Sequence, residues 1–529
     1  MDSYIGSYGY TIHKKYISSE QVKKITSDLT VKPNIHNGMP SQSVTSFPVY
    51  RESSSKYYVP KFYGIEHFGS VQTRLKENSL ANDLLFVGSL REYQNTIVDK
   101  YINIAHNGQD IGGGGLLEID TGLGKTVIAI NIIAKLKVKT LIVVHKEFLL
   151  NQWIERLNEF TPAAKIGRIQ GKIMDTEGKD VVIAMLQSIS MKDYNPDIFK
   201  QFGLMVIDEV HHMGAEVFSN ALSKVVTKYT LGLSATMNRK DGLAKVFKMF
   251  LGPIIHTEKR ELSMNQVNVR CLQYFTRDEE FNETSYDYRG KTQYSKMISK
   301  LCSYNHRSEY ILRYICELLR EDPKQQIMIL AHNKCLLKYF YDSIVSRNIA
   351  NQSVGYYVGG MKESDLKISE KKTIVIATYS MASEGLDIKT LTTLVLATPK
   401  TDVVQAVGRI LRVKHANPLV IDVIDSHEIF KRQFSQRKRF YKSQEYGISF
   451  ISSNLGSFDK KHWQTKMYKD VESKQRDKNT VNCERKTSAT YNAPPELLKI
   501  LNTPVNMYDD DDDALNSYLN TDEECHIEV

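Results

Sequence analysis

The most constraining feature of this sequence is a repeated alternation between short apolar runs and longer amphipathic segments. Nine short runs are rich in Val, Ile and Leu, and they begin at Leu116, Thr140, Val181, Leu204, Thr230, Gln326, Thr373, Thr393 and Leu419. Such runs predict buried strands, and the amphipathic segments between them predict the covering helices of parallel α/β domains. Because 529 residues exceed what one hydrophobic core organises, the runs predict two such domains in tandem within three or four structural units.

The chain divides into four regions. Residues 1–85 are rich in Tyr, Ser and Lys, and we expect a small accessory region that grips a partner or braces the next domain. Residues 86–256 and 257–446 contain the two series of strands. In residues 447–529 the strand pattern ends and polar residues dominate, which predicts a largely mobile tail with an acidic end.

Charge is distributed unevenly along the chain. Residues 507–529 contain nine acidic residues and no Lys or Arg, so residues 1–506 carry a net charge of +18 although the whole chain carries +9. A basic body predicts a polyanionic partner. The acidic end is interpreted either as a solvated, disordered segment or as a tethered mimic of that partner.

The beginning of the chain lacks the apolar stretch of a secretory leader. In addition, no run approaches the roughly 20 apolar residues that are needed to span a bilayer. The sequence therefore predicts an intracellular protein that is not secreted and has no membrane partner.

A loop suited to phosphate binding follows the first apolar run. Its glycine N–H groups and the start of the next predicted helix would attract an anion, Lys125 adds a positive charge, and the Thr126 hydroxyl suits Mg²⁺. The pattern departs from the strict phosphate-loop motif because Ile119 replaces its first glycine, so a glycine turn before an ordinary helix is the alternative. The candidate nucleotide-binding residues here are Thr121, Gly122, Leu123, Gly124, Lys125 and Thr126.

Two adjacent carboxylates, Asp208 and Glu209, end the apolar run that begins at Leu204. Open α/β sheets place their ligands at the carboxyl ends of strands. Asp208 would hold Mg²⁺ together with Thr126, and Glu209 would orient and deprotonate an attacking water. The alternative is a simple helix cap, for which Asp208 alone would be sufficient.

These motifs and three others resemble those of the superfamily 2 helicases. Lys125 and Thr126 match motif I, Asp208–His211 match motif II in its Asp-Glu-Val-His form, and Ser234–Thr236 match motif III. Ala377–Ile388 resemble motif V, and Gln405–Arg412 match the Q-x-x-G-R-x-x-R pattern of motif VI. The motifs follow the family order over residues 85–445. The resemblance implies two tandem RecA-like lobes and an enzyme that hydrolyses ATP, with Mg²⁺, to translocate along nucleic acid or unwind it.

The resemblance also implies roles for residues beyond the first-lobe motifs. Arg409 and Arg412, three residues apart on one helix face, would reach the γ-phosphate from the second lobe, and Gln405 would contact the same region. Gly385 and Asp387 would line the nucleotide cleft. The alternative for the two arginines is an ordinary surface pair. The catalytic candidates are therefore Lys125, Asp208, Glu209, Gln405, Arg409 and Arg412.

One further residue, Gln94, lies ahead of motif I, where the family resemblance implies recognition of adenine. A buried structural glutamine is the alternative. Sequence spacing does not distinguish between these two roles.

A path for nucleic acid is implied by the same resemblance. Its candidate residues are Lys146, Gln187, Asn333, Gly359 and Thr378, although each of them would also serve as a loop cap. Residues 429–442 alternate basic and aromatic side chains. There, an aromatic stripe predicts packing on the second lobe, and the basic face predicts nonspecific affinity for nucleic acid.

Within the superfamily, the Asp-Glu-Val-His box and Leu251–Pro253 resemble the DNA helicases of repair and transcription, including transcript-release helicases of large cytoplasmic DNA viruses. Lys240 replaces the acidic residue of that group's Arg-Glu-Asp motif. Composition and size favour the viral branch, which implies the host cytoplasm, the virion and partners in the transcription machinery. DNA is the favoured substrate. The alternatives are an RNA helicase with the same motor and a scaffold that binds nucleic acid through a degenerate motor.

Overall fold

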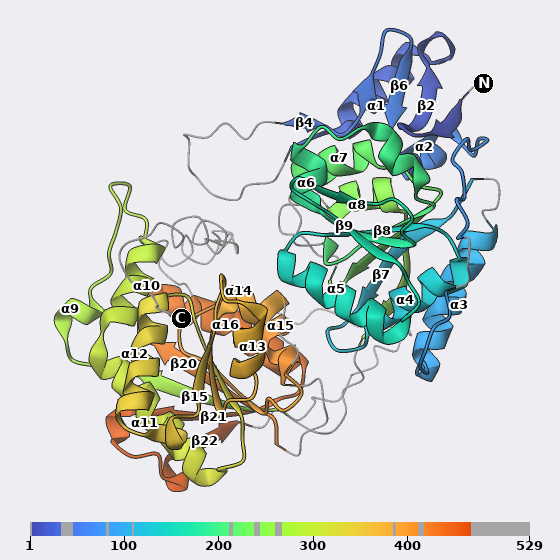
Figure 1. The fold of residues 1–529 in the computed structure, drawn as a ribbon. Helices are drawn as coiled ribbons and strands as arrows, with labels where there is room; N and C mark the ends of the chain where they lie inside the picture. The colour runs from blue at the N-terminus through green and yellow to red at the C-terminus, as the bar shows by residue number, and fades with distance from the viewer. Residues whose placement is uncertain are drawn as a thin grey trace, which may run out of the picture.

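The computed structural model describes residues 3–32, 46–80, 84–107, 111–210, 215–236, 244–259, 267–384, 388–410 and 417–466. It contains two α/β lobes and a small N-terminal module that packs on the first lobe (Figure 1). The acidic segment and the rest of residues 467–529 lie outside the described residues. No helix in the described ranges is long and apolar enough to cross a membrane.

The first lobe is built on a sheet with the strand order β10-β9-β11-β8-β12-β13-β7-β14 within the described residues. All five predicted strands are confirmed, and they are β7 (Gly114–Ile119), β8 (Thr140–Val144), β11 (Val181–Met185), β12 (Leu204–Ile207) and β13 (Tyr229–Ser234). These five are mutually parallel. The edges are formed by β14 (Ile254–Glu258) on one side and by the hairpin of β9 (Ile166–Gln170) and β10 (Ile173–Asp175) on the other.

Alternate residues along these strands bury opposite faces of the sheet. Leu141 and Val143 pack toward α6 (Leu186–Met191), α7 (Ala215–Lys224) and α8 (Ala244–Leu251). Ile142 and Val144 pack toward α3 (Glu92–Asn107), α4 (Lys125–Leu136) and α5 (Glu147–Phe160). Because a strand turns successive side chains to opposite faces, an unbroken apolar run is what a sheet covered on both sides requires.

The second lobe has the strand order β17-β18-β16-β19-β20-β15-β21-β22 within the described residues. The four predicted strands are confirmed as β16 (Ile327–Ala331), β18 (Ile374–Thr378), β19 (Thr393–Leu396) and β20 (Leu419–Asp425). They are joined by β15 (Asn268–Tyr274), β17 (Val354–Tyr357), β21 (Gly447–Ser452) and β22 (Gln464–Lys466). The helices of this lobe are α9 (Glu279–Asn282), α10 (Tyr294–Ser303), α11 (Asn305–Glu321), α12 (Lys334–Ser346), α13 (Glu363–Ser369), α14 (Tyr379–Glu384), α15 (Val404–Arg409) and α16 (Glu428–Ser443).

The expectation that the strand pattern ends near Gly447 is wrong for residues 447–466. β21 pairs in parallel with β15, and β22 pairs antiparallel with β21. Ile448 and Ile451 are buried in the core of the lobe. The run is short and contains Gly and Ser, so it becomes a strand only because β15 offers it a free edge. The second sheet therefore extends to Lys466, and β14 carries the first sheet through Glu258.

The N-terminal module, residues 3–80, has its own antiparallel sheet. Its strands are β1 (Tyr4–Gly6), β2 (Gly9–His13), β6 (Lys56–Val59) and β5 (Arg51–Glu52), and its helices are α1 (Ser19–Leu29) and α2 (Lys61–Phe68). A small ladder joins β3 (Thr30–Val31) to β4 (Phe47–Pro48). Tyr10 of β2 belongs to the same buried cluster as Leu141 of the first sheet, so the module and the first lobe share one core.

A buried lysine lies where the module meets the lobe. The side chain of Lys61 is 3% exposed, and its Nζ donates a hydrogen bond of 2.6 Å to the carbonyl of Lys228. Burial, followed by the charge of Lys228, lowers the pKa of Lys61 from 10.5 to about 7. Between pH 10.5 and about 7 the unfolded chain protonates this lysine and the folded chain does not. The free energy of unfolding is therefore highest above pH 10.5, and it decreases as the pH falls to about 7.

We therefore expect Lys61→Met to raise the melting temperature, and to raise it more at pH 6.5 than at pH 9.5. Near neutral pH, the charge of the wild-type lysine costs up to about 5 kcal/mol, from 1.36 kcal/mol per pKa unit. Thermal denaturation of both proteins at the two pH values measures the difference, with Lys24→Met, an exposed lysine of α1, as the control. An equal difference at both pH values would contradict the assignment.

Candidate functional site

The predicted phosphate loop connects β7 to α4. Gly122 and Gly124 have φ values of 85° and 84°, a left-handed conformation that glycine adopts without strain. Leu123 donates its N–H to the Asp120 carbonyl over 3.2 Å, which closes the turn. Gly124 is the N-cap of α4 and provides no side-chain acceptor, so the positive end of this helix faces the loop without a side-chain cap. This arrangement can bind an anion, and nucleotide binding by the loop residues stays a prediction.

Three charged side chains converge beside this loop. Asp208 follows β12 directly and is 6% exposed, and Glu209 follows it with a φ of 49°. The Nζ atom of Lys125, the first residue of α4, lies 3.3 Å from Oε1 of Glu209. The parallel order of β7, β13 and β12 brings these residues, which are more than 80 positions apart, to one edge of the sheet.

A tryptophan that sequence reasoning missed holds the Asp208 carboxylate. Trp153 of α5 is 1% exposed, and its Nε1 donates to Oδ2 of Asp208 over 2.9 Å, while the Glu209 N–H donates to Oδ1 over 3.0 Å. Burial, and then the charge of Glu209, raises the pKa of Asp208 to about 6, despite the opposing effects of Lys125 and the two hydrogen bonds. The only sequence signal was a lone Trp on an amphipathic helix, which indicates core packing and not a role beside a carboxylate.

Gln94 lies against the phosphate loop. Its Nε2 donates to the Leu123 carbonyl over 3.0 Å, and its Oε1 accepts from the N–H of Arg91 over 2.9 Å. A Cβ atom on Gly124 would lie 2.5 Å from this Nε2, and the φ of 84° at Gly124 favours glycine at that position. These contacts are those that the structural alternative for Gln94 expects, and adenine recognition stays a prediction.

The second lobe reaches the loop through α15, which contains Gln405 and Arg409. A Cβ atom on Gly408 would lie 3.4 Å from Cβ of Thr121, so motif VI faces the phosphate loop across the junction of the lobes. Arg409 is 5% exposed, and its Nε donates to the carbonyl of Ala382 on α14 over 2.9 Å. The predicted residues Gly385, Asp387 and Arg412, with His211 of motif II and Lys240, lie outside the described residues.

A second contact between the lobes involves α13. Nζ of Lys367 lies 2.6 Å from Oε1 of Glu155 on α5, and both side chains are more than half exposed. An ion pair so exposed to solvent contributes little to stability. It therefore positions the lobes without fixing them rigidly.

The five candidate nucleic-acid residues all lie at or just beyond the carboxyl ends of strands. Lys146 is the N-cap of α5, after β8, and Gln187 donates its Nε2 to the carbonyl of His145 over 2.9 Å, which joins the segments after β8 and β11. Asn333 caps α12 after β16 by accepting the N–H of residue 335 over 2.7 Å. Thr378 ends β18, and its Oγ1 lies 3.2 Å from that of Ser380. Gly359, after β17, has open space where a side chain would stand. Asn333 thus acts as a cap, and nucleic-acid contact by any of the five stays a prediction.

Comparison with known proteins decides the family. The family described as "Type III restriction enzyme, res subunit" matches residues 88–239, and that described as "Helicase conserved C-terminal domain" matches residues 310–414. A protein of Acanthamoeba polyphaga mimivirus, named an ATP-dependent RNA helicase, is 39% identical over 462 residues, which are 85% of this chain and 88% of the relative. This chain belongs to the superfamily 2 helicases.

A second viral relative also matches most of this chain. A protein of African swine fever virus, also named an ATP-dependent RNA helicase, is 27% identical over 394 residues, which are 69% of this chain and 75% of the relative. Among solved structures, the crystal structure of T4 UvsW aligns with 85% of this chain and 99% of its own, at 17% identity and a TM-score of 0.34. The expected kinship with viral helicases is confirmed by the first two relatives. This helicase hydrolyses ATP, and its partner is a nucleic acid.

The hydrogen bond between Trp153 and Asp208 predicts a measurable coupling in the helicase. We expect Trp153→Phe to lower the free energy of unfolding by roughly 2–3 kcal/mol, because it removes a donor from a buried carboxylate. Part of this loss should disappear in the Asp208→Asn background, where the acceptor is no longer ionised. Denaturant unfolding of the four proteins gives the coupling energy.

Trp463→Phe is the matched control for that cycle. The Nε1 of Trp463 donates to an uncharged acceptor, the Phe458 carbonyl, over 3.2 Å. Its loss should therefore be smaller and independent of Asp208. Strict additivity of Trp153→Phe and Asp208→Asn would show that the carboxylate does not depend on the indole.

Proposed function

We propose that this helicase is a DNA-stimulated ATPase that hydrolyses ATP between its lobes and uses lobe movement to translocate along DNA or unwind it. The observation that carries the proposal is the position of Gly408, whose helix α15 meets the phosphate-loop residue Thr121 from the opposite lobe. A site assembled from two lobes is completed only when they approach, so each hydrolysis event is linked to a relative movement.

Within this proposal, Lys125 changes partner when ATP binds. In the structure its ammonium group faces Glu209 at 3.3 Å. The β- and γ-phosphates carry more negative charge than one carboxylate, so they would attract Lys125 and release Glu209. A released Glu209 is then positioned to orient the attacking water and accept its proton.

The proposed Mg²⁺ site consists of Thr126 and Asp208. Mg²⁺ prefers hard oxygen ligands, which a hydroxyl and a carboxylate provide. The burial of Asp208 and its raised pKa support this assignment. A cation would stabilise the charged form of a carboxylate that burial and the neighbouring Glu209 destabilise. When bound, the ion would neutralise charge on the β- and γ-phosphates. The hydrogen bonds from Trp153 and from the Glu209 N–H fix the orientation of this carboxylate.

The second lobe would supply the cations for the transition state. We assign Arg409 and Arg412 to the γ-phosphate, with Gln405 beside them and Gly385 and Asp387 lining the cleft. Arg409 is buried and bonded to the carbonyl of Ala382, so its orientation is coupled to the motif V helix α14. Movement of this helix by nucleic acid at the adjacent Thr378 would therefore reach the arginine, which gives a physical route for stimulation.

A DNA substrate in transcription or repair is supported by the Asp-Glu-Val-His box and by Leu251–Pro253. Lys146, Gln187, Asn333, Gly359 and Thr378 would form the path, because they lie at the carboxyl edges of the two sheets. The second candidate is an RNA substrate, which the names of the viral relatives favour. The two substrates differ at the 2′-hydroxyl, and the motor itself is common to both.

Substitutions at the loop and at motif II test the catalytic roles. We expect Lys125→Ala to weaken ATP binding at least about tenfold, because it removes a charge-assisted contact to phosphate. Glu209→Gln should retain binding and reduce turnover by roughly 100-fold or more. Nucleotide titration and steady-state ATPase assays separate the two effects.

Lys135→Ala is the matched control for Lys125→Ala. Lys135 lies on the same helix, and its ion pair with Asp99 is exposed. It should leave both binding and turnover unchanged. Wild-type turnover in Glu209→Gln would remove Glu209 from the role of general base.

The choice between DNA and RNA is tested by stimulation of ATP turnover. We expect single-stranded DNA to stimulate the ATPase more strongly than RNA of the same length and sequence. Stimulation should fall as salt rises, since phosphate contacts release counterions. Stronger stimulation by RNA would show that RNA is the substrate. The absence of stimulation by either nucleic acid would contradict the proposal that this helicase is a nucleic-acid-stimulated ATPase.

A further inference from the structure

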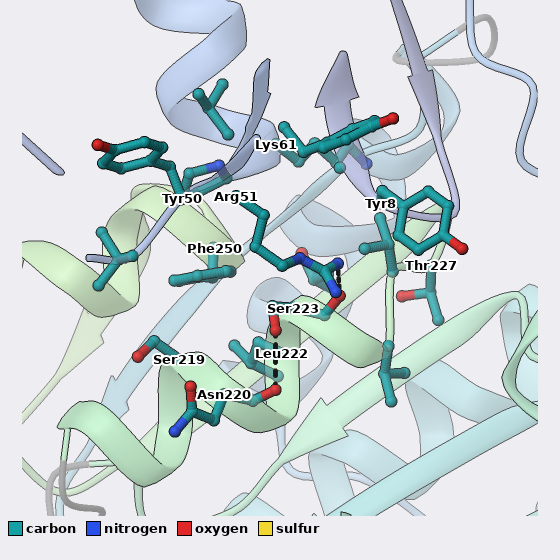
Figure 2. Close-up of a pocket in the computed structure, with 18 of the residues that line it drawn as sticks. Tyr8, Tyr50, Arg51, Lys61, Ser219, Asn220, Leu222, Ser223, Thr227 and Phe250 are labelled. Carbon is teal, nitrogen blue, oxygen red and sulfur yellow. Dashed lines mark hydrogen bonds between the residues drawn. The ribbon is translucent and has the colours of Figure 1, made fainter. Parts of the chain in front are cut away.

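A cavity of about 190 Å³ lies between the N-terminal module and the first lobe. The module contributes Tyr8 near β2, Arg51 of β5 and Lys61 of α2, and the lobe contributes α7, Phe250 of α8 and the beginnings of β12 and β13. Figure 2 shows Arg51 extending from the module toward Ser223 on α7. The cavity is at the amino ends of the strands, whereas Asp208 and Ser234 stand at their carboxyl ends, so it is separate from the nucleotide site.

Two basic side chains line this cavity, and no carboxylate of the described residues pairs with them. Arg51 donates from Nη2 to the Ser223 carbonyl, and Lys61 donates to the Lys228 carbonyl. No acidic residue contributes to the electrostatic environment of either side chain. A carbonyl carries only partial charge, so it satisfies a hydrogen bond without balancing a full positive charge.

The guanidinium has further donors directed to the cavity. Arginine carries five N–H groups in a planar fork, and one of them is used by a described residue. Ser219 and Thr227 also line the cavity, but their hydroxyl groups already donate to the carbonyls of Glu216 and Tyr229 over 3.0 and 2.6 Å, so the donors for an oxyanion come from the two basic side chains. This combination suits a planar oxyanion such as a carboxylate, which accepts paired hydrogen bonds from a guanidinium.

Much of the remaining lining is apolar. Val49, Leu222 and Phe250 contribute to the lining, and the guanidinium carbon of Arg51 lies over the ring of Tyr8, 5.1 Å from its centre. An engineered apolar cavity of about 150 Å³ binds benzene, so the present volume holds a body of about that size plus a small charged group.

We propose that this cavity is a binding site for a small organic carboxylate with an apolar body of about the size of benzene. The carboxylate pairs with Arg51 and Lys61, and the apolar body packs against Leu222 and Phe250. Such a ligand bridges the module and the lobe. It balances the charge of Arg51 and favours the protonated form of Lys61, which burial alone disfavours. The alternative is that Arg51 and Lys61 serve only to join the module to the first lobe through their hydrogen bonds to lobe carbonyls. A test of ligand binding distinguishes the two roles.

Benzoate is the probe, tested on the full chain by calorimetric titration and by thermal shift. We expect saturable one-to-one binding at millimolar concentration or below and a melting temperature that rises with benzoate. Lys61→Met should weaken binding roughly tenfold or more, since it removes one charge-assisted contact. Arg51→Gln should have the same effect, and Lys24→Met, an exposed position of α1 outside the cavity lining, should have none.

Two further compounds separate charge from shape. Benzyl alcohol matches the body of benzoate without its charge, and inorganic phosphate has charge without the body, so both should bind at least about tenfold more weakly. Lys61→Met is expected to fold at least as well as the wild type, so its result is informative even if Arg51→Gln unfolds. Absence of benzoate binding, equal binding of either analogue, or unchanged binding by Lys61→Met would overturn the proposal.

Discussion

Parallel pairing of strands is the constraint on which the rest of this structure depends. Within each lobe, β-strands that run in one direction place all their carboxyl ends on a single edge of the sheet. Lys125 after β7, Asp208 after β12 and Ser234 at the end of β13 therefore lie at the same edge, although the chain between them is long. The N-terminal module packs near the opposite edge of the first sheet, where the strands begin. The cavity proposed to bind a carboxylate lies between the module and this edge.

The second lobe contains two buried ion pairs on a single strand. Asp422 and Asp425 of β20 accept paired hydrogen bonds from Arg437 of α16 and Arg307 of α11, over 2.8 Å and 2.5–2.8 Å. All four side chains are buried. Removing one partner of such a pair leaves an uncompensated charge in the core, so these pairs specify how α11 and α16 dock on the sheet. Their geometry also fixes the motif VI side of the lobe, because Arg437 donates a further bond to the carbonyl of Lys400.

In the basic segment 429–442, the predicted packing of the aromatic residues is confirmed, but the predicted exposure of all the basic residues is not. The aromatic stripe packs on the lobe as predicted, with Phe430 and Tyr441 buried. Arg437, however, belongs to the core and not to the basic outer face. A carboxylate on a strand 15 residues earlier decides this, and helical periodicity contains no information about that partner.

Sequence alone determined the strands of both sheet centres, the order of the motifs and hence the two-lobed helicase fold, because apolar runs and loop motifs are local signals. Tertiary structure alone decided that Trp153 holds Asp208, that Gln94 bonds to the carbonyl of Leu123 and that β21 adds to β15. It also brought Arg51 and Lys61 to one cavity. Each of these contacts joins segments that are distant in the chain, and a distant partner is chosen by the packing of whole elements and not by the residues beside it.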